Sequence, residues 1–382
     1  MIIVIYSILT TLLGALLITF GIRLERALQQ FRIKKQYTSA IEAPSVTVCV
    51  PARNETHAMT QCLERVLNSD YKKLEIIVFD DESADDTSVL INSFAHAGVR
   101  FVPGANLPEG WLGKNHALEV LAQEASGTYV LFLDVDTHIE PTTISRLVGY
   151  TMTENLEMVS VIPGRNDAWR PGVLFGHLRY YWELITSREY SPATSSSLWM
   201  IKRHTLIDII GGFSPHKAEV EPEAHLAAII GTKAYHCLVG SEDLGISYEK
   251  KWTSQCETSI RLSYPMVGGT KKMGAYGLLI LTLLNLPTLL IISGLFVSWT
   301  PFHGLAVLYL VLFSLLYCRY TYVVWRRNWW LGAVVWPYAI AQELVLFIRS
   351  VRGYAKGTIT WKGRPVTSPQ QARLMHPAQY IK

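Results

Sequence analysis

The chain has 382 residues, of which 49% are hydrophobic and 17% charged, and its formal net charge is +4. This length exceeds one minimal domain and suits a soluble domain of ordinary size joined to several membrane segments. The five cysteines form no CxxC pair and show no zinc-ligand spacing with histidine. This pattern excludes a cysteine zinc module and is typical of reduced, structural thiols.

The first predicted element is an apolar helix over residues 1–22, which contain no charged side chain. At about 1.5 Å per residue, such a helix crosses a hydrocarbon core of about 30 Å. A secretory signal peptide has its positive charges before the apolar run, whereas here Arg23, Arg26, Lys34 and Lys35 follow it. We therefore expect a retained transmembrane helix that leads into the cytoplasm.

The second predicted unit, residues 44–272, alternates short apolar runs rich in β-formers with helical stretches. The predicted strands are 46–50, 74–79, 99–102, 129–133 and 158–162, and the predicted helices are 57–68, 87–97, 115–125 and 142–152. This alternation predicts an α/β domain with a mostly parallel, buried sheet. Ligands of such sheets bind at the carboxyl ends of the strands, so the residues after each strand are the candidates for function.

The third predicted unit, residues 275–348, is a membrane region. Two spans, 275–297 and about 305–317, run out and back around a turn at 299–301. A third apolar stretch, 329–348, contains Pro337, Gln342 and Glu343, and a complete crossing would place the following residues outside. We therefore expect a re-entrant or interfacial segment there, and a multi-pass cell-membrane protein whose α/β domain is cytoplasmic.

The last unit, residues 349–382, contains seven Lys and Arg residues and no acid, so the rest of the chain carries −3. The positive-inside rule places such a tail in the cytoplasm. Because it adjoins a membrane segment, it favours anionic lipid headgroups or a diphosphate over nucleic acid.

Acidic residues follow three of the predicted strands. Pro51-Ala52-Arg53-Asn54-Glu55 follows the first strand, Asp80-Asp81-Glu82-Ser83 the second and Asp134-Val135-Asp136 the fourth. Acids that converge on one sheet edge repel one another unless a cation or hydrogen-bond donors lie between them. Carboxylate oxygens of a DxD motif suit Mg²⁺ or Mn²⁺, which would bridge the phosphates of a nucleotide-diphosphate. A solvated turn or helix cap is the alternative interpretation of this motif.

Two further motifs are interpreted in the same way. Asp80 and Asp81 could accept hydrogen bonds from a nucleoside base and ribose, or Asp81, Ser83 or Asp85 could merely cap the following helix. Lys114, in Gly110-Trp111-Leu112-Gly113-Lys114-Asn115, stands at a predicted helix start and offers a charge for a phosphate. An ordinary glycine-containing loop is the alternative there.

Taken together, these motifs resemble glycosyltransferase family 2 with its GT-A fold. The resemblance rests on PARNE at 51–55, DDES at 80–83, DVD at 134–136 and GGF at 211–213, and covers about residues 44–272. GWLGKNHA at 110–117, the flanking apolar helices and ITWKGR at 359–364 are most similar to a membrane-bound branch. That branch comprises the 4,4'-diaponeurosporenoate (carotenoid) glycosyltransferases, with hopanoid-associated glycosyltransferases next.

The resemblance implies an inverting transfer of a hexose from a nucleotide-diphosphate sugar, UDP-glucose in the usual case, to a membrane lipid or carotenoid-type acceptor. It implies that Asp136 binds Mg²⁺ or Mn²⁺ and that Asp134 contacts the ribose or the donor sugar. It further implies that Lys114 lies near the diphosphate or the donor sugar. The residues that would line the base pocket are Ala52, Glu55 and Asp81.

The catalytic base is expected shortly after the GGF motif, because an inverting transfer needs a carboxylate to take the acceptor's proton. The family usually has an acidic pair at a helix start there, and this chain departs from that pattern. Aligning Leu226 with the family's helical leucine places Glu223 at the base position, with Glu221 second and Asp243 third. Pro222 followed by an acid is also an ordinary helix start.

One cation of the family pattern is absent, because Ile246 stands where relatives often have arginine. The contact would be missing, or supplied by Lys250, Lys251 or the basic tail. Two alternatives to a single-transfer enzyme remain at this point. A processive polysaccharide synthase is disfavoured because no Gln/Arg-x-x-Arg-Trp motif follows the GGF region. A non-catalytic membrane protein that retains the nucleotide-binding fold is favoured only by the altered acidic pair.

Overall fold

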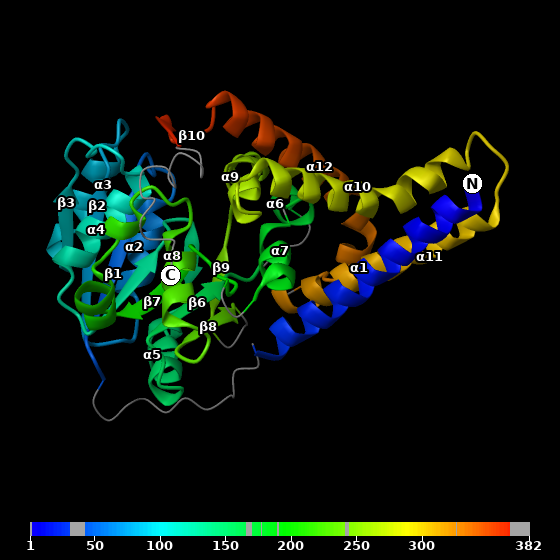
Figure 1. Cartoon of the computed structure of the whole chain (residues 1–382). Coiled ribbons are helices and arrows are strands. Elements are labelled where there is room, and N and C mark those ends of the chain that lie inside the picture. The colour runs from blue at the N-terminus through cyan, green and yellow to red at the C-terminus, as the bar shows by residue number, and fades with distance from the viewer. Residues whose placement is uncertain are drawn as a thin grey trace.

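The computed structural model describes residues 2–30, 43–165, 170–176, 178–188, 191–240, 244–325 and 327–366. Figure 1 shows a sheet-containing part at one end and a helical arm at the other. The arm contains α1 (Ile2–Gln30), α10 (Lys271–Ser293) and α11 (Pro301–Val324), and the N-terminus lies at its far end. Helix α12 (Leu331–Lys356) runs back from the arm toward the sheet part.

The main sheet has seven strands in the order β3-β2-β1-β4-β7-β6-β8. Only β7 is antiparallel to its two neighbours, so the expected mostly parallel α/β sheet is confirmed. The strands are β1 (Val46–Ala52), β2 (Leu74–Asp80), β3 (Val99–Pro103), β4 (Tyr129–Leu133), β6 (Met158–Ile162), β7 (Leu198–Lys202) and β8 (Tyr235–Val239). The sequence interpretation missed β7 and β8, and a small second sheet pairs β5 (Thr137–Ile139) with β9 (Ile246–Tyr248).

Both faces of the sheet are buried. Along β1, Val48 and Val50 face one core with Met59 of α2, and Cys49 faces the other core with Leu121 of α4. A strand that is covered on both faces reads as a continuous apolar run, which is why these strands were predictable. The helices and helical turns of this part are α2 (Met59–Leu67), α3 (Thr87–Ser93), η1 (Ala95–Ala97), α4 (Gly113–Glu124), α5 (Thr143–Thr153), α6 (Pro171–Leu174), α7 (Arg179–Thr186), η2 (Thr205–Ile210), η3 (Ser214–His216), α8 (Pro222–Ile230) and α9 (Trp252–Met266).

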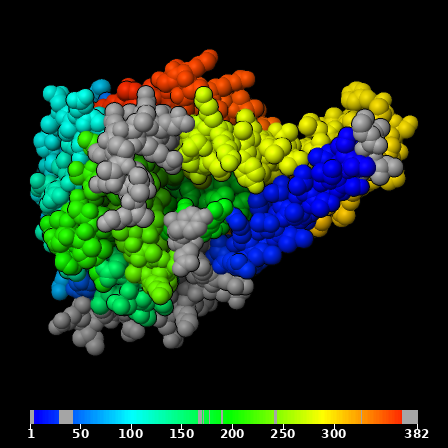
Figure 2. Space-filling model, viewed as in Figure 1, coloured from blue at the N-terminus to red at the C-terminus, as the bar shows by residue number. Residues whose placement is uncertain are grey.

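Helices α1, α10, α11 and α12 are each long and apolar enough to cross a membrane. They differ in how far the protein covers them: half of the most apolar window of α12 is buried, against 11–22% in the other three. Helix α12 is continuous through Pro337, and its residues pack on α9, α10 and α11. In Figure 2 the orange surface of α12 extends along the top of the molecule toward the sheet part. Whether α12 lies in the interface stays a prediction.

A short hairpin follows α12 and returns the chain to the sheet. Helix α12 ends at Gly357, whose φ of +65° is left-handed, and β10 (Thr360–Trp361) then pairs with β11 (Arg364–Pro365). The two residues between these strands, Lys362 and Gly363, both have positive φ. This is the backbone that a two-residue hairpin loop requires. Figure 1 places β10 beside the top of the sheet part.

Candidate active site

The polar edge of the sheet is built by three adjacent strands. Strands β2, β1 and β4 lie side by side and run parallel, so the residues after them emerge at one edge. The antiparallel β7 begins at this same edge, because Leu198 pairs with Leu133 and the Asp134 N–H donates to the Ser197 carbonyl at 2.9 Å. The acids predicted after the second and fourth strands therefore share one edge.

Four of the predicted acids of this edge, Glu55, Asp81, Asp134 and Asp136, face a cation. Asp134 accepts from Lys114 Nζ at 2.7 Å, and Asp136 Oδ2 lies 3.5 Å from Lys250 Nζ. Arg364 of the C-terminal hairpin bonds to both carboxylate oxygens of Asp81, at 2.7 and 2.8 Å. Lys362, at the hairpin turn, pairs with Glu55. Of the cations named as alternatives to an arginine at Ile246, Lys250 lies beside Asp136, and Lys362 and Arg364 of the tail lie beside Glu55 and Asp81.

The two aspartates after β2 have different environments. Asp80 accepts hydrogen bonds from the hydroxyls of Ser83 and Ser88, and so holds the following loop. Asp81 is 2% exposed; burial raises its pKa, and Arg364 opposes this rise. Asp81 thus faces the cation-lined side, and the capping alternative is met by Asp85, whose Oδ1 accepts from the Thr87 N–H at the start of α3 at 3.1 Å. Ala52 is also buried, and its carbonyl accepts from the Asp81 N–H at 2.8 Å.

Helix α4 links this edge to the segment that follows the GGF motif. From its first turn, Lys114 reaches Asp134, and the next residue, Asn115, donates to the carbonyls of residues 216, 217 and 219 at 2.7–3.1 Å. One turn later on the same face of α4, Glu119 accepts from the Phe213 N–H at 2.6 Å. Gly212 has a φ of +74°, and a Cβ there would lie 2.5 Å from Glu119, so the turn requires glycine.

The two acids predicted first and second as the base occupy this held segment. Glu221 precedes α8 and accepts from Arg179 Nη2 at 2.6 Å. Glu223, in the first turn of α8, is 1% exposed, and its Oε1 has no hydrogen-bond partner among the described residues. Burial, followed by the nearby Glu221 charge, raises the pKa of Glu223 to about 7. The third candidate, Asp243, lies outside the residues that the structure describes.

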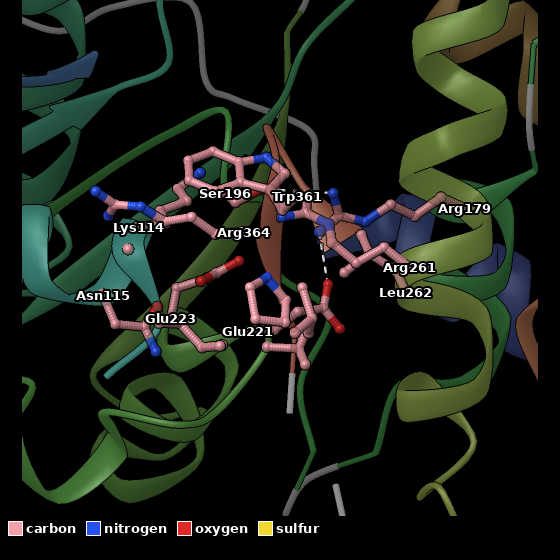
Figure 3. A pocket seen from close by; sticks show the side chains of 15 residues that line it. Lys114, Asn115, Arg179, Ser196, Glu221, Glu223, Arg261, Leu262, Trp361 and Arg364 are labelled. Carbon is pink, nitrogen blue, oxygen red and sulfur yellow. Dashed lines mark hydrogen bonds and ion pairs between the residues drawn. The ribbon is translucent and has the colours of Figure 1, made fainter. Parts of the chain in front are cut away.

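Two adjoining cavities connect these groups. One, which we call the DVD cavity, has a volume of about 760 Å³ and is lined by Asp134, Asp136, Glu55 and Lys362 among others. The other, which we call the Glu223 cavity, has a volume of about 520 Å³ and is shown in Figure 3. Figure 3 places Glu221 and Glu223 between α4 on one side and Arg179 and Arg261 on the other. The residues that line both cavities are Lys114, Arg179, Ser196, Arg261 and Trp361.

Three basic residues of these cavities were missed as site residues by the sequence interpretation. Arg179 is the first residue of α7, Arg261 lies on α9 and Arg364 on the hairpin. The guanidinium of Arg261 stacks over Trp361 at 5.6 Å, and its buried Nε has no hydrogen-bond partner in the described part of the chain. Only the ITWKGR motif gave a sequence signal for this group, since the other two arginines stand in ordinary helical stretches.

The donor set of the DVD cavity suits a hard divalent cation. Asp134 and Asp136 are each about a quarter exposed, so their oxygens are accessible. The described residues contain no cluster of three or more His, Cys, Asp or Glu side chains that could hold a metal alone. Mg²⁺ and similar ions are commonly held by one or two carboxylates plus substrate phosphates, and these residues fit that arrangement.

Comparison with known proteins agrees with this architecture. Residues 47–204, less than half of the chain, match the family model "Glycosyl transferase family 2". The solved structure of a mannosyltransferase from Pyrobaculum calidifontis, in complex with GDP-Man and Mn²⁺, superimposes with a TM-score of 0.57 at 18% identity, over 91% of this chain and 99% of that one. This likeness confirms the expected GT-A fold.

Two curated relatives each match less than a third of the chain. A GalNAc(5)-diNAcBac-PP-undecaprenol beta-1,3-glucosyltransferase of Campylobacter jejuni is 32% identical over 108 residues, 28% of this chain and 34% of that protein. A UDP-Glc:alpha-D-GlcNAc-diphosphoundecaprenol beta-1,3-glucosyltransferase of Escherichia coli is 32% identical over 112 residues, 29% and 43% of the two chains. The chain thus spans well under half the length of these relatives. Their names agree with the enzyme class expected from the sequence.

Proposed function

We propose that the chain is an inverting glycosyltransferase that moves a hexose from a nucleotide-diphosphate sugar to a lipid acceptor at the cytoplasmic face of a membrane. The observation that carries the proposal is the junction of two cavities at Lys114, Arg179 and Arg261. The DVD cavity contains acids at a sheet edge that are paired with lysines. The Glu223 cavity contains a buried acid, Glu223, one of whose carboxylate oxygens has no hydrogen-bond partner among the described residues. This is the layout that a two-substrate transfer requires.

The donor is assigned to the DVD cavity. Asp136 would hold Mg²⁺ or Mn²⁺ together with the donor's phosphates, and the ion would supply charge stabilisation for the departing diphosphate. Asp81 and Glu55 would face the nucleoside, with Ala52 in the pocket wall. Asp134 would contact the ribose or the sugar, and Lys114, 2.7 Å from it, would contact the diphosphate.

Glu223 is the proposed base. The acceptor hydroxyl attacks the anomeric carbon opposite the diphosphate while its proton passes to Glu223. A base with a pKa of about 7 is half ionised at neutral pH, and so can both accept and later release this proton. Glu221 is held by Arg179, which makes it the weaker candidate.

The finer assignment is UDP-glucose as donor and a polyisoprenoid-type lipid, such as a carotenoid, as acceptor. Support comes from the resemblance of GWLGKNHA and ITWKGR to the carotenoid branch and from relatives whose names specify undecaprenyl-linked acceptors. The four apolar helices would hold the chain at the bilayer, from which such an acceptor would reach Glu223. The chain would then be a multi-pass cell-membrane protein.

The test is mass spectrometry of membrane lipids and pigments from cells that express the wild type or the Asp136→Ala variant. The expected result is one lipid species with an added hexose, present only with the wild type. Purified protein incubated with UDP-glucose, Mn²⁺ and that lipid should reproduce the product. Identical lipid profiles, together with equal donor consumption by both proteins, would contradict the proposal and favour a non-catalytic protein.

A further inference from the structure

Two polar residues interrupt the apolar sequence of α12, and both reach out of the helix bundle. Glu343 is 3% exposed, and it accepts from the Leu178 N–H at 2.9 Å and from Trp182 Nε1 at 3.1 Å. Its neighbour Gln342 donates to the Phe175 carbonyl at 3.1 Å and accepts from Trp252 Nε1 at 2.9 Å. These contacts attach α12 to α7 and to the start of α9.

The position of the Glu343 contacts on α7 matters for the site. Glu343 meets α7 at two places: Oε1 accepts from the backbone N–H of Leu178, the N-cap that precedes α7, and Oε2 accepts from the Trp182 side chain one turn later. The next residue after each, Arg179 and Glu183, forms the adjacent face. Arg179 lines both cavities and pairs with Glu221 at 2.6 Å. The bond to the Leu178 N–H anchors the start of α7, and the bond to the Trp182 side chain holds one face of α7 toward α12. Together they fix the position and rotation of the first turn of α7, and hence where the Arg179 guanidinium lies.

We propose that Glu343 is a positioning residue for glycosyl transfer: from α12, it holds α7 in the rotation that places Arg179 on Glu221, beside the base Glu223. The proposal rests on the proposed function, since it gives Glu343 a role in that reaction. It also explains why a carboxylate stands in an apolar helix. Such groups are costly there and occur where they face protein partners.

The charges around Glu223 make this role measurable. The groups that face it or line its cavity are Glu221 and His225 on its own segment, Lys114 on α4, Arg179 and Glu183 on α7, Arg261 on α9 and Arg364 on β11. Arg179 lowers the pKa of Glu223, whereas Glu221 raises it. If α7 turns and withdraws Arg179, the pKa of Glu223 rises. The base then stays protonated to a higher pH. The acid limb of the pH–rate profile, where the rate falls because the base is protonated, therefore moves to higher pH.

The experiment uses full-length protein in lipid nanodiscs, with Glu343→Ala, Glu343→Gln and Trp182→Phe compared with the wild type. Consumption of UDP-glucose, and of GDP-mannose in parallel, is followed with Mn²⁺ from pH 5 to 9. We expect kcat to fall about tenfold to a hundredfold for Glu343→Ala, because small misplacements at a reaction centre have effects of this size. Glu343→Gln keeps one acceptor oxygen and should retain more activity. The acid limb should move to higher pH, while the Kd of UDP with Mn²⁺ stays within about twofold.

Controls separate positioning from loss of stability. Asn285→Leu removes a buried polar contact between α10 and α12, where Asn285 Nδ2 donates to the Ile340 carbonyl at 3.2 Å, and leaves α7 untouched. It should keep the wild-type kcat and pH profile. In an Arg179→Ala background, Glu343→Gln should no longer move the acid limb, because both act through one group. Trp182→Phe removes one donor to Glu343 and keeps an aromatic ring, so it serves if Glu343→Ala does not fold.

The outcomes distinguish the two proposals. A wild type that neither binds UDP with Mn²⁺ nor consumes either donor contradicts the proposed function itself. An active wild type, with folded Glu343 and Trp182 variants that keep its kcat and its acid limb, overturns the positioning role alone. An equal shift of the acid limb with and without Arg179 also overturns it.

Discussion

The two cavities of the site treat their acids in opposite ways. In and beside the DVD cavity, Glu55, Asp81, Asp134 and Asp136 each face a lysine or arginine. In the Glu223 cavity, Glu221 is paired with Arg179, whereas Glu223 is buried with an oxygen that has no partner among the described residues. Ion-paired acids suit ligand binding, whereas a buried acid whose pKa is raised toward neutrality suits proton transfer. Electrostatic environment, rather than residue type, thus divides binding from catalysis.

The strongest way to break this comparison is to remove the acid assigned to the metal. Asp136→Asn keeps the size of the side chain and removes its charge, so we expect kcat/KM to fall about a thousandfold through lost charge stabilisation. Calorimetry should find no Mn²⁺-dependent binding of UDP. The matched control is Asp208→Asn, at an exposed position of η2, which should leave kcat/KM and UDP binding unchanged. Full turnover in Asp136→Asn would mean that the DVD cavity is not the donor site.

The second test removes the buried acid. Glu223→Gln cannot accept a proton, so kcat should fall about a hundredfold or more, the usual range for a lost general base. Because Glu223 lies outside the DVD cavity, the affinity for UDP with Mn²⁺ should be unchanged. Glu154→Gln, at an exposed residue after α5, provides the control. If donor affinity and kcat fall together, the division between the two cavities is wrong.

The third test concerns the pH profile. Glu223 has a raised pKa of about 7, so the rate should fall as pH drops below 7 and the base becomes protonated. Glu221 contributes to that rise, and Glu221→Gln also releases Arg179 toward Glu223. Both effects lower the pKa of Glu223, so the acid limb should move to lower pH. A limb that stays in place, measured as kcat from pH 5 to 9, would argue that another group is the base.

The smallest expected effect concerns the hairpin. Arg364→Ala leaves the nearly buried Asp81 without its bidentate partner, and hydrogen bonds to charged groups contribute about 1.5–3 kcal/mol. We expect a lower Tm and faster tryptic cleavage within residues 357–366. Arg352→Ala, an exposed arginine on α12, should change neither. Equal Tm values for the two variants would show that the hairpin is held by other contacts.

The acids of the DVD cavity were largely predictable, because they follow strands that can be recognised in the sequence as continuous apolar runs. Val46 to Ala52 and Tyr129 to Leu133 are buried on both faces, so their apolar runs identified the strands and hence the acids that follow. The partners of those acids were not predictable. Arg364 contacts Asp81 across 283 positions of sequence and Lys362 contacts Glu55 across 307, and nothing local encodes such pairs.

The residues of the Glu223 cavity were also only partly predictable from the sequence. Glu223 was ranked first from an alignment of one leucine, whereas its burial depends on how α7, α4 and the hairpin meet around it. Arg179 stands in the sequence as an ordinary residue of an amphipathic helix. Strand β7 was missed because Leu198 to Lys202 is short and is preceded by small polar residues, and its antiparallel direction has no sequence signature.

That reversed strand has a consequence for how the site can change. Because β7 begins at the functional edge, the segment that enters it, including Ser196 and Ser197, forms part of the wall of the DVD cavity. The segment that leaves β7 emerges at the opposite edge of the sheet. Insertions before Leu198 would therefore reshape the space around the two substrates, while insertions after Lys202 would leave it untouched. At β7, the fold thus offers one end, the entry to the strand, at which added residues could alter specificity without disturbing the sheet.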